Sequence, residues 1–187
     1  MPERPPVVVL DAWVVVGFYD GEEFAASEFG RLLEADDAVT VMSAVNFAEV
    51  CSGLARVRGL AAASRDTEWL RGYVVLDPVT SDLAETAARI KLGFHMSLGD
   101  AFAAATALGC DAPLWTGDAE LLCENALWQA IDLRHDERRQ LHADQIEDGT
   151  KQVGRRSSGP LAGLDSDTLA EYVTAPLRTG AETETLR

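Results

Sequence analysis

The sequence has 187 residues, of which 47% are hydrophobic, and this predicts one main domain with a sizeable core. Its 31 acidic and 16 basic residues give a net charge of −15, which excludes a protein that holds nucleic acid by surface charge alone. Any polyanionic ligand would need metal cations. The apolar run 7–19 is short and interrupted by Asp11, so no membrane span or export signal is expected. Three cysteines without CxxC spacing favour free thiols and a cytoplasmic location: Cys51, Cys110 and Cys123.

The predicted elements alternate between strands and helices. Short β-branched apolar runs separated by amphipathic segments are typical of parallel strands that are buried on both faces. The pattern therefore predicts an α/β fold with a central parallel sheet. In chain order we expect a strand at 7–10, a helix at 22–35, a strand at 39–42, helices at 44–60 and about 67–72, a strand at 74–76, helices at 83–94 and 97–108, a strand at 114–116, a helix at 119–125 and a strand at 128–133.

Regular patterning stops near Arg134. The segment 135–187 is charged, contains a Gly/Ser/Arg-rich stretch at 154–160 and has one weak helical pattern at 165–173. Its apolar density is too low for a core of its own. We therefore expect a folded domain at 1–134 and a charged, partly disordered tail at 135–187.

Four carboxylates interrupt otherwise apolar elements: Asp11, Glu49, Asp100 and Asp118. Asp11 and Asp118 follow predicted strands, and ligands of parallel α/β sheets bind beyond the carboxyl ends of the strands. Glu49 shares the polar stripe of the helix at 44–60 with Asn46, and Asp100 lies in the first turn of the helix at 97–108. Clustered carboxylates suit Mg²⁺ or Mn²⁺, which prefer oxygen ligands.

Each acid also has a simpler interpretation. Asp100 belongs to a capping box that begins at Ser97, Asp118 is placed to cap the next helix, and a glutamate such as Glu49 is usually solvated. Asp11 is the strongest candidate, because an acid directly after a doubly buried strand is costly unless it is paired or metal-bound.

A phosphatase of the haloacid-dehalogenase type would also place an acid after the first strand. That class requires a second aspartate two positions later, where this chain has Trp13. The three histidines lie outside any nucleophile-elbow or HExxH pattern, which gives little support to histidine-based catalysis.

The order and context of the acids resemble the PIN-domain ribonucleases, specifically the VapC-like toxins of bacterial toxin–antitoxin pairs. The resemblance covers residues 7–134, and it depends on four motifs in the family's order. They are Val-Leu-Asp11-Ala, Asn-Phe-Ala-Glu49-Val, Ser-Leu-Gly-Asp100-Ala-Phe-Ala-Ala-Ala-Thr-Ala and Trp-Thr116-Gly-Asp118-Ala-Glu-Leu-Leu.

The resemblance implies a three-layer α/β/α sandwich and an endoribonuclease that depends on Mg²⁺ or Mn²⁺. It implies that Asp11, Glu49 and Asp100 bind the metal, and that Asp118 completes the cluster or holds a second ion. Thr116 and Asn46 would support these acids. Members of the family cut RNA with an activated water and leave a 3′-hydroxyl and a 5′-phosphate.

The resemblance also implies partners: a cognate antitoxin that blocks the site with a basic segment, and a second copy of the chain in a homodimer. Residues 1–134 contain 21 acidic and 9 basic residues, a balance of −12 that disfavours RNA outside the metal site. Arg56, Arg58 and Arg65 are the candidate phosphate contacts, although each is equally consistent with a solvated helix residue.

One departure from the family concerns Trp13, because the family commonly has a small hydroxyl residue at this position. Together with the acidic surface, it favours an alternative of a different class, a degenerate PIN domain that acts as a non-catalytic protein-binding module. Retention of all four acids favours the nuclease.

Overall fold

The computed structural model describes residues 5–35 and 38–134, so the predicted tail at 135–187 lies outside the described residues. The described residues form five strands and six helices. The strands are β1 (Val7–Leu10), β2 (Val39–Ser43), β3 (Val74–Asp77), β4 (Leu114–Thr116) and β5 (Ala130–Asp132). The helices are α1 (Ala12–Asp20), α2 (Glu23–Ala35), α3 (Ala44–Arg58), α4 (Leu60–Leu70), α5 (Ser81–Gly93) and α6 (Leu98–Cys110).

All five strands are parallel and lie in the order β3-β2-β1-β4-β5. On the central strand, Val9 is in register with Val41 of β2 and with Leu114 of β4. The chain builds the sheet outward from β1 to β3 and then returns to the other side of β1 with β4. The topological switch point, where such sheets bind ligands, therefore lies between the carboxyl ends of β1 and β4.

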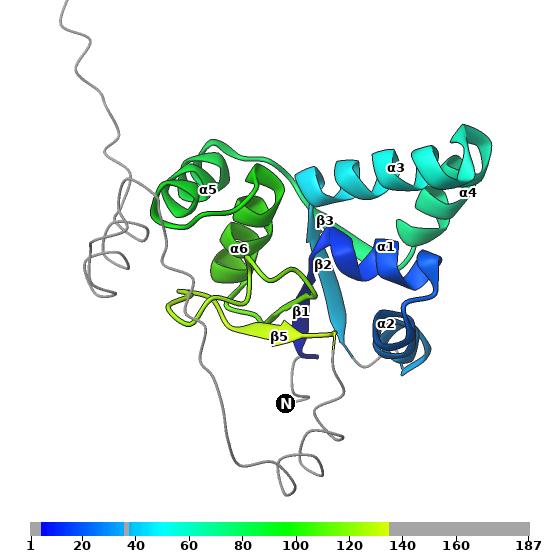
Figure 1. Ribbon diagram of the computed structural model, residues 1–187, viewed down its shortest axis with the longest axis horizontal. Coiled ribbons are helices and arrows are strands. Elements are labelled where there is room, and N and C mark those ends of the chain that lie inside the picture. Colours follow the sequence, from blue (N-terminus) through cyan, green and yellow to red (C-terminus); the bar gives the residue numbers. More distant parts are fainter. Residues whose placement is uncertain (1–4, 36–37, 135–187) are drawn as a thin grey trace, which may run out of the picture.

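Helices cover both faces of the sheet: α5 and α6 lie on one face, and α1 to α4 lie on the other (Figure 1). Because strand side chains alternate between faces, Val9 packs in the core beside α5 and α6, whereas Leu10 packs in the core of the opposite layer. The alanine-rich helix α6 is buried from Gly99 to Ala107, and its small side chains allow it to pack closely on the sheet. The predicted three-layer α/β/α sandwich is confirmed.

One helix, α1, was not predicted. Val14, Val15 and Val16 form a β-branched run that continues the apolar character of β1, so the sequence gives no sign of the change from strand to helix. The helix begins at Asp11, which is the N-cap of α1 and whose Oδ1 accepts a 2.7 Å hydrogen bond from the Ala12 N–H.

The helix predicted at 44–60 ends at Arg58, and α4 begins at Leu60, much earlier than the predicted 67–72. Gly59 separates the two helices with a φ of 80°, a left-handed conformation that glycine adopts without steric cost.

The helix predicted at 119–125 is wrong, because these residues form turns. The Asp118 carboxylate accepts from the Glu120 N–H at 2.9 Å, and this side-chain hydrogen bond closes a turn in place of a helix. The Trp128 indole then donates to the Leu121 carbonyl at 3.0 Å, which fixes the loop, and β5 starts at Ala130 rather than at 128.

Among the described residues, none of the helices has both the length and the apolar character needed to cross a membrane.

Candidate metal centre

Asp11 stands at the carboxyl end of the central strand and is only 3% exposed. Its Oδ1 is held by the Ala12 N–H, and its Oδ2 accepts a 2.9 Å hydrogen bond from the Thr116 hydroxyl at the end of β4. Burial raises the pKa of Asp11 from 3.8 to about 7. This value includes the smaller contributions: the charges of Asp100 and Asp118 add to the rise, and the hydrogen bonds from Thr116 and Ala12 oppose it.

Asn46 joins three elements at the centre of the site. It is fully buried in the first turn of α3, and the Ser43 hydroxyl donates a short hydrogen bond to its Oδ1. Its Nδ2 lies within hydrogen-bonding distance of Asp11 Oδ1 at 3.4 Å, of Glu49 Oε2 at 3.2 Å and of the Gly99 carbonyl at 3.2 Å. The predicted supporting residue Asn46 therefore ties β1, α3 and the start of α6 together.

Glu49 lies one turn after Asn46, and its carboxylate rests directly on the backbone of Gly99. A Cβ at Gly99 would overlap both Glu49 oxygens, so this approach requires glycine at position 99. Burial raises the pKa of Glu49, the Asp100 charge raises it further, and the Asn46 hydrogen bond lowers it. Glu49 therefore lies next to Gly99 and within reach of the Asp100 charge, although its side chain remains exposed to solvent.

Asp100 caps α6, as the simpler interpretation predicts. The Ser97 hydroxyl accepts from the Asp100 N–H at 3.0 Å, and Asp100 Oδ2 accepts from the Ser97 N–H at 2.9 Å. This capping role does not exclude a place in the site, because the charge of Asp100 acts on both Asp11 and Glu49. The capping box orients the carboxylate at the edge of the sheet.

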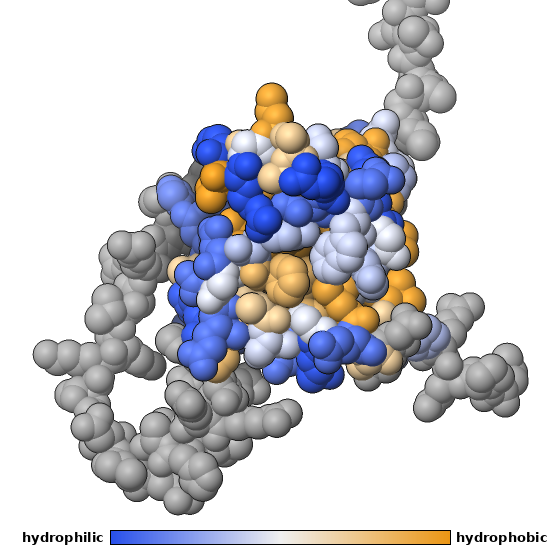
Figure 2. Space-filling model, turned by 90° about the vertical axis from the view of Figure 1, so that its right-hand side faces the viewer, coloured by the Kyte–Doolittle hydropathy of each residue, from blue (hydrophilic) through white to orange (hydrophobic). Residues whose placement is uncertain are grey.

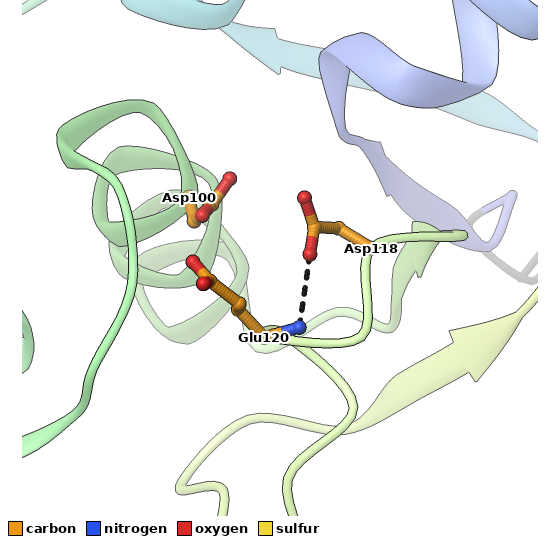
Figure 3. Close-up of side chains that lie close together, drawn as sticks. All are labelled: Asp100, Asp118 and Glu120. Carbon is orange, nitrogen blue, oxygen red and sulfur yellow. Dashed lines mark hydrogen bonds between the residues drawn. The ribbon is translucent and has the colours of Figure 1, made fainter. Parts of the chain in front are cut away.

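Asp118 and Glu120 come from the loop after β4, and their carboxylates point toward that of Asp100 (Figure 3). One ligand oxygen from each of these three residues lies within 4.8 Å of the others, a spacing that could hold a metal ion. The Asp118 N–H donates to the Thr116 hydroxyl at 2.9 Å, so Thr116 connects Asp118 to Asp11.

Glu120 was missed by the sequence analysis. The motif around Asp118 already contains Glu120, but a helix at 119–125 gave no reason to direct its side chain toward Asp100. The turn that replaces this helix brings the Glu120 carboxylate close to that of Asp100. The other neighbour of Glu120 is His95, whose Nδ1 lies 3.8 Å from Glu120 Oε1.

Among the described residues, the structure therefore brings Asp100 and Asp118 together with Glu120, with oxygens within 4.8 Å of one another. Asp11 and Glu49 lie outside this group of three and are linked to it through Asn46 and through the charge of Asp100. All five offer carboxylate oxygens, the donors that Mg²⁺ and Mn²⁺ prefer. Like charges at this spacing repel one another, which is consistent with the raised pKa values of Asp11 and Glu49. The donor set fits a hard divalent cation.

The three predicted RNA-contacting arginines lie along α3 and α4. Arg56 and Arg58 are in the last turn of α3, and the seven residues from Glu49 to Arg56 correspond to about 10 Å along a helix. Arg58 pairs with Asp66 at 3.1 Å, and Arg65 is exposed on α4. The structure does not bring these arginines into the acidic cluster.

Fold and site together define the class of this protein, a doubly wound α/β domain with a candidate divalent-cation centre at the switch point of its sheet. The PIN domain family model matches residues 8–126, so the chain belongs to the PIN domain family.

Solved structures support the same fold. VapBC2 from Rickettsia felis, bound to a DNA fragment from its promoter, is similar with a TM-score of 0.55 and 11% identity, covering 67% of this chain and 98% of that one. VapBC-1 from nontypeable Haemophilus influenzae gives 0.55 and 19% identity, with 69% and 99% covered. Mycobacterium tuberculosis VapC20, described as a Sarcin-Ricin loop cleaving toxin, gives 0.53 and 19%, with 62% and 92% covered. A search of curated proteins found no match.

Proposed function

We propose that this protein is a metal-dependent endoribonuclease and the toxin of a toxin–antitoxin pair. One observation supports the proposal: the carboxylates of Asp100, Asp118 and Glu120 lie within 4.8 Å of one another at the switch point of a PIN-domain sheet, and the charges of Asp100 and Asp118 act on the buried Asp11. VapC20 is described as a toxin that cleaves the Sarcin-Ricin loop, and we extend RNA cleavage to this chain as a proposal.

In the proposed mechanism, Asp11, Glu49, Asp100 and Asp118 hold Mg²⁺ or Mn²⁺, and Glu120 adds a further carboxylate beside Asp100 and Asp118. When bound, the ion would supply the positive charge that neutralises these carboxylates and the Lewis acidity that activates water for hydrolysis of a phosphodiester. Thr116 and Asn46 position the carboxylates.

Thr116 and Asn46 also affect the protonation of Asp11. The Thr116 hydroxyl and the Asn46 amide can donate to Asp11 but cannot neutralise it, and with a pKa raised to about 7 Asp11 is partly protonated near neutral pH until a cation replaces the proton. The empty cluster would repel a phosphodiester.

We also propose a basic antitoxin as the partner. The balance of −12 over residues 1–134 would attract a cationic segment to the acidic cluster. Exposed apolar side chains favour a protein partner as well, because Val57 and Leu60, where α3 meets α4, are 71% and 79% exposed. Figure 2 shows apolar side chains at the surface on the side of the molecule where α3 and α4 lie.

Three further parts of the proposal come from the family resemblance and the sequence: a homodimer, a cytoplasmic location, and phosphate contacts from Arg56, Arg58 and Arg65. The exposed positions of Arg56 and Arg65 allow contacts with RNA that extends beyond the acidic cluster.

Cleavage of total RNA by the purified full chain tests the activity. We expect cleavage with Mn²⁺ that leaves 5′-phosphate ends and is abolished both by EDTA and by Asp11→Asn. Asp82→Asn, at an exposed acid in the first turn of α5, is the matched control and should cleave like the wild type. Sequencing of RNA ends after induced expression would identify the target.

The alternative hypothesis, a degenerate PIN domain that only binds a protein, predicts a different result. If the wild type leaves RNA intact with Mn²⁺ and Mg²⁺ but binds a partner tightly, the nuclease proposal is wrong. Purification from native cells tests the antitoxin separately, and recovery of the chain without any small basic protein would contradict that partner.

A further inference from the structure

The side chain of Trp13 lies beside the acidic cluster, in the first turn of α1 and two residues after Asp11. It packs on Gly117, the residue directly before Asp118. A Cβ added at Gly117 would stand 2.5 to 2.6 Å from three consecutive ring atoms of Trp13, Cη2, Cζ2 and Cε2. Because these distances are nearly equal, Gly117 faces the plane of the six-membered ring rather than its edge.

This contact fixes the indole between two segments that carry proposed metal ligands. Glycine at 117 is what permits it, because any side chain there would displace the ring. The ring also contacts the core between the sheet and α1 to α4, so its position is constrained on more than one side.

The indole is nevertheless partly exposed. Within the described part of the chain its Nε1–H makes no hydrogen bond, and unlike the Nε1–H of Trp115 it is not fully buried. Gly117 covers one face of the ring, and the part of the indole that stays exposed beside the acidic cluster is an aromatic surface that a nucleobase can contact by stacking and by a hydrogen bond.

The charge of the domain makes such a contact useful. With a balance of −12 over residues 1–134, general attraction to phosphates cannot supply much affinity for RNA. Stacking of a base on an aromatic side chain contributes about 1–3 kcal/mol and does not depend on charge.

We propose that Trp13 is a substrate-binding residue that contacts the nucleobase next to the phosphate at the metal centre. The inference rests on the proposed RNA hydrolysis, and it gives a role to the residue at which this chain departs from its family. It predicts that the substrate is single-stranded at this position, since a base in a duplex cannot expose its face to the ring.

Steady-state cleavage of a fluorescein-labelled single-stranded RNA with Mn²⁺ tests the proposal in the full chain. Trp13→Leu keeps an apolar side chain against Gly117 but removes the aromatic face and the N–H, and it should raise KM about 10-fold with kcat changed less than twofold. Trp13→Phe keeps a stacking face and should raise KM less than Trp13→Leu. The control is Trp69→Leu, at a partly exposed tryptophan that stacks on Phe18, and it should leave KM unchanged.

Two further readouts separate substrate contact from a structural role. Mn²⁺ affinity by calorimetry should be equal in the wild type and Trp13→Leu. RNA added in Ca²⁺ should quench the tryptophan fluorescence of the wild type, and Trp13→Phe should lose that quenching. Trp69→Phe should retain it.

An active wild type whose KM is unchanged in Trp13→Leu, or whose RNA-dependent quenching persists in Trp13→Phe, would overturn this inference alone. A Trp13→Leu protein that loses Mn²⁺ affinity together with kcat would show a structural role and would also overturn it. Failure of the wild type to cut or bind any RNA would instead remove the proposed function, and this inference with it.

Discussion

At the scale of single residues, Asp11 combines a structural role with a proposed chemical one. It caps α1, accepts a hydrogen bond from Thr116 and is almost completely buried, so its ionised form lacks the solvation it would have in water. The raised pKa of about 7 is the consequence. A buried acid destabilises the folded protein when it ionises, so its presence at this position favours a role in holding a cation.

Replacement of Asp11 by Asn should change how stability depends on pH in the metal-free protein. The folded state holds the proton of Asp11 up to about pH 7, whereas the unfolded chain releases it near 3.8. The wild type therefore loses stability as the pH rises from 3.8 to about 7, by roughly 4 kcal/mol in all, and the variant lacks this loss.

Urea unfolding in EDTA at pH 4 and pH 8 measures the effect. The free energy of unfolding of Asp11→Asn minus that of the wild type should be several kcal/mol larger at pH 8 than at pH 4, because only the wild type is destabilised over this range. A difference that does not vary with pH would show that Asp11 titrates normally.

At the scale of elements, the start of α6 supplies both a proposed metal ligand, Asp100, and a contact surface for Glu49. The capping box orients Asp100, while the absence of a side chain at Gly99 lets the Glu49 carboxylate reach the backbone of the helix. The packing of α3 on α6 is therefore part of the site.

Gly99→Ala should weaken metal binding without unfolding the protein. The three atoms nearest to the added Cβ all belong to the end of the flexible Glu49 side chain, which can move away, and alanine is the better helix former by about 1 kcal/mol. We expect a free energy of unfolding within about 1 kcal/mol of the wild type, and an Mn²⁺ affinity reduced about 10-fold because Glu49 is displaced.

Gly109→Ala in the same helix is the control, since a Cβ there meets no atom within 4 Å. Chemical unfolding and calorimetric titration with Mn²⁺ would be compared for the two variants. Equal Mn²⁺ affinity in Gly99→Ala and Gly109→Ala would remove Glu49 from the metal centre.

At the scale of the whole molecule, the acidic residues concentrate repulsion at the switch point of the sheet. A ligand that binds only the folded state stabilises it by about 2.7 kcal/mol when present at 100 times its Kd. A cation that relieves the repulsion should therefore be visible in the melting temperature of the entire domain.

Mn²⁺ should raise the Tm of the wild type by several degrees. Each kcal/mol of added stability raises the Tm by about 4–8 °C in a domain of up to 100 residues, and by less in a larger one. The double variant Asp100→Asn/Asp118→Asn should lose this rise, while its Tm in EDTA should be at least that of the wild type, because two repelling charges are removed. A scan with Asp82→Asn provides the control, and an Mn²⁺ response that survives in the double variant would contradict the assigned ligands.

The strands and most helices were predictable because the core is apolar at regular intervals. Runs such as Val7–Leu10 mark buried parallel strands, and the spacing of apolar residues in α3 and α5 marks amphipathic helices. The missed helix α1 and the wrong helix at 119–125 depend on something other than apolar periodicity. Both were decided by local hydrogen bonds that the backbone N–H groups of Ala12 and Glu120 donate to the carboxylates of Asp11 and Asp118.

The sequence by itself determined the layers of the sandwich and four of the acids, because hydrophobic periodicity is local and a carboxylate that interrupts an apolar element is visible in one dimension. Only the tertiary structure decided how those acids meet. Asn46 reaches Asp11, 35 residues earlier in the chain, and Thr116 reaches it across 105 residues, while a turn brings Glu120 to Asp100. Contacts of this kind depend on the strand order and on how closely the helices approach one another and the sheet, and neither can be predicted from any one segment of the chain.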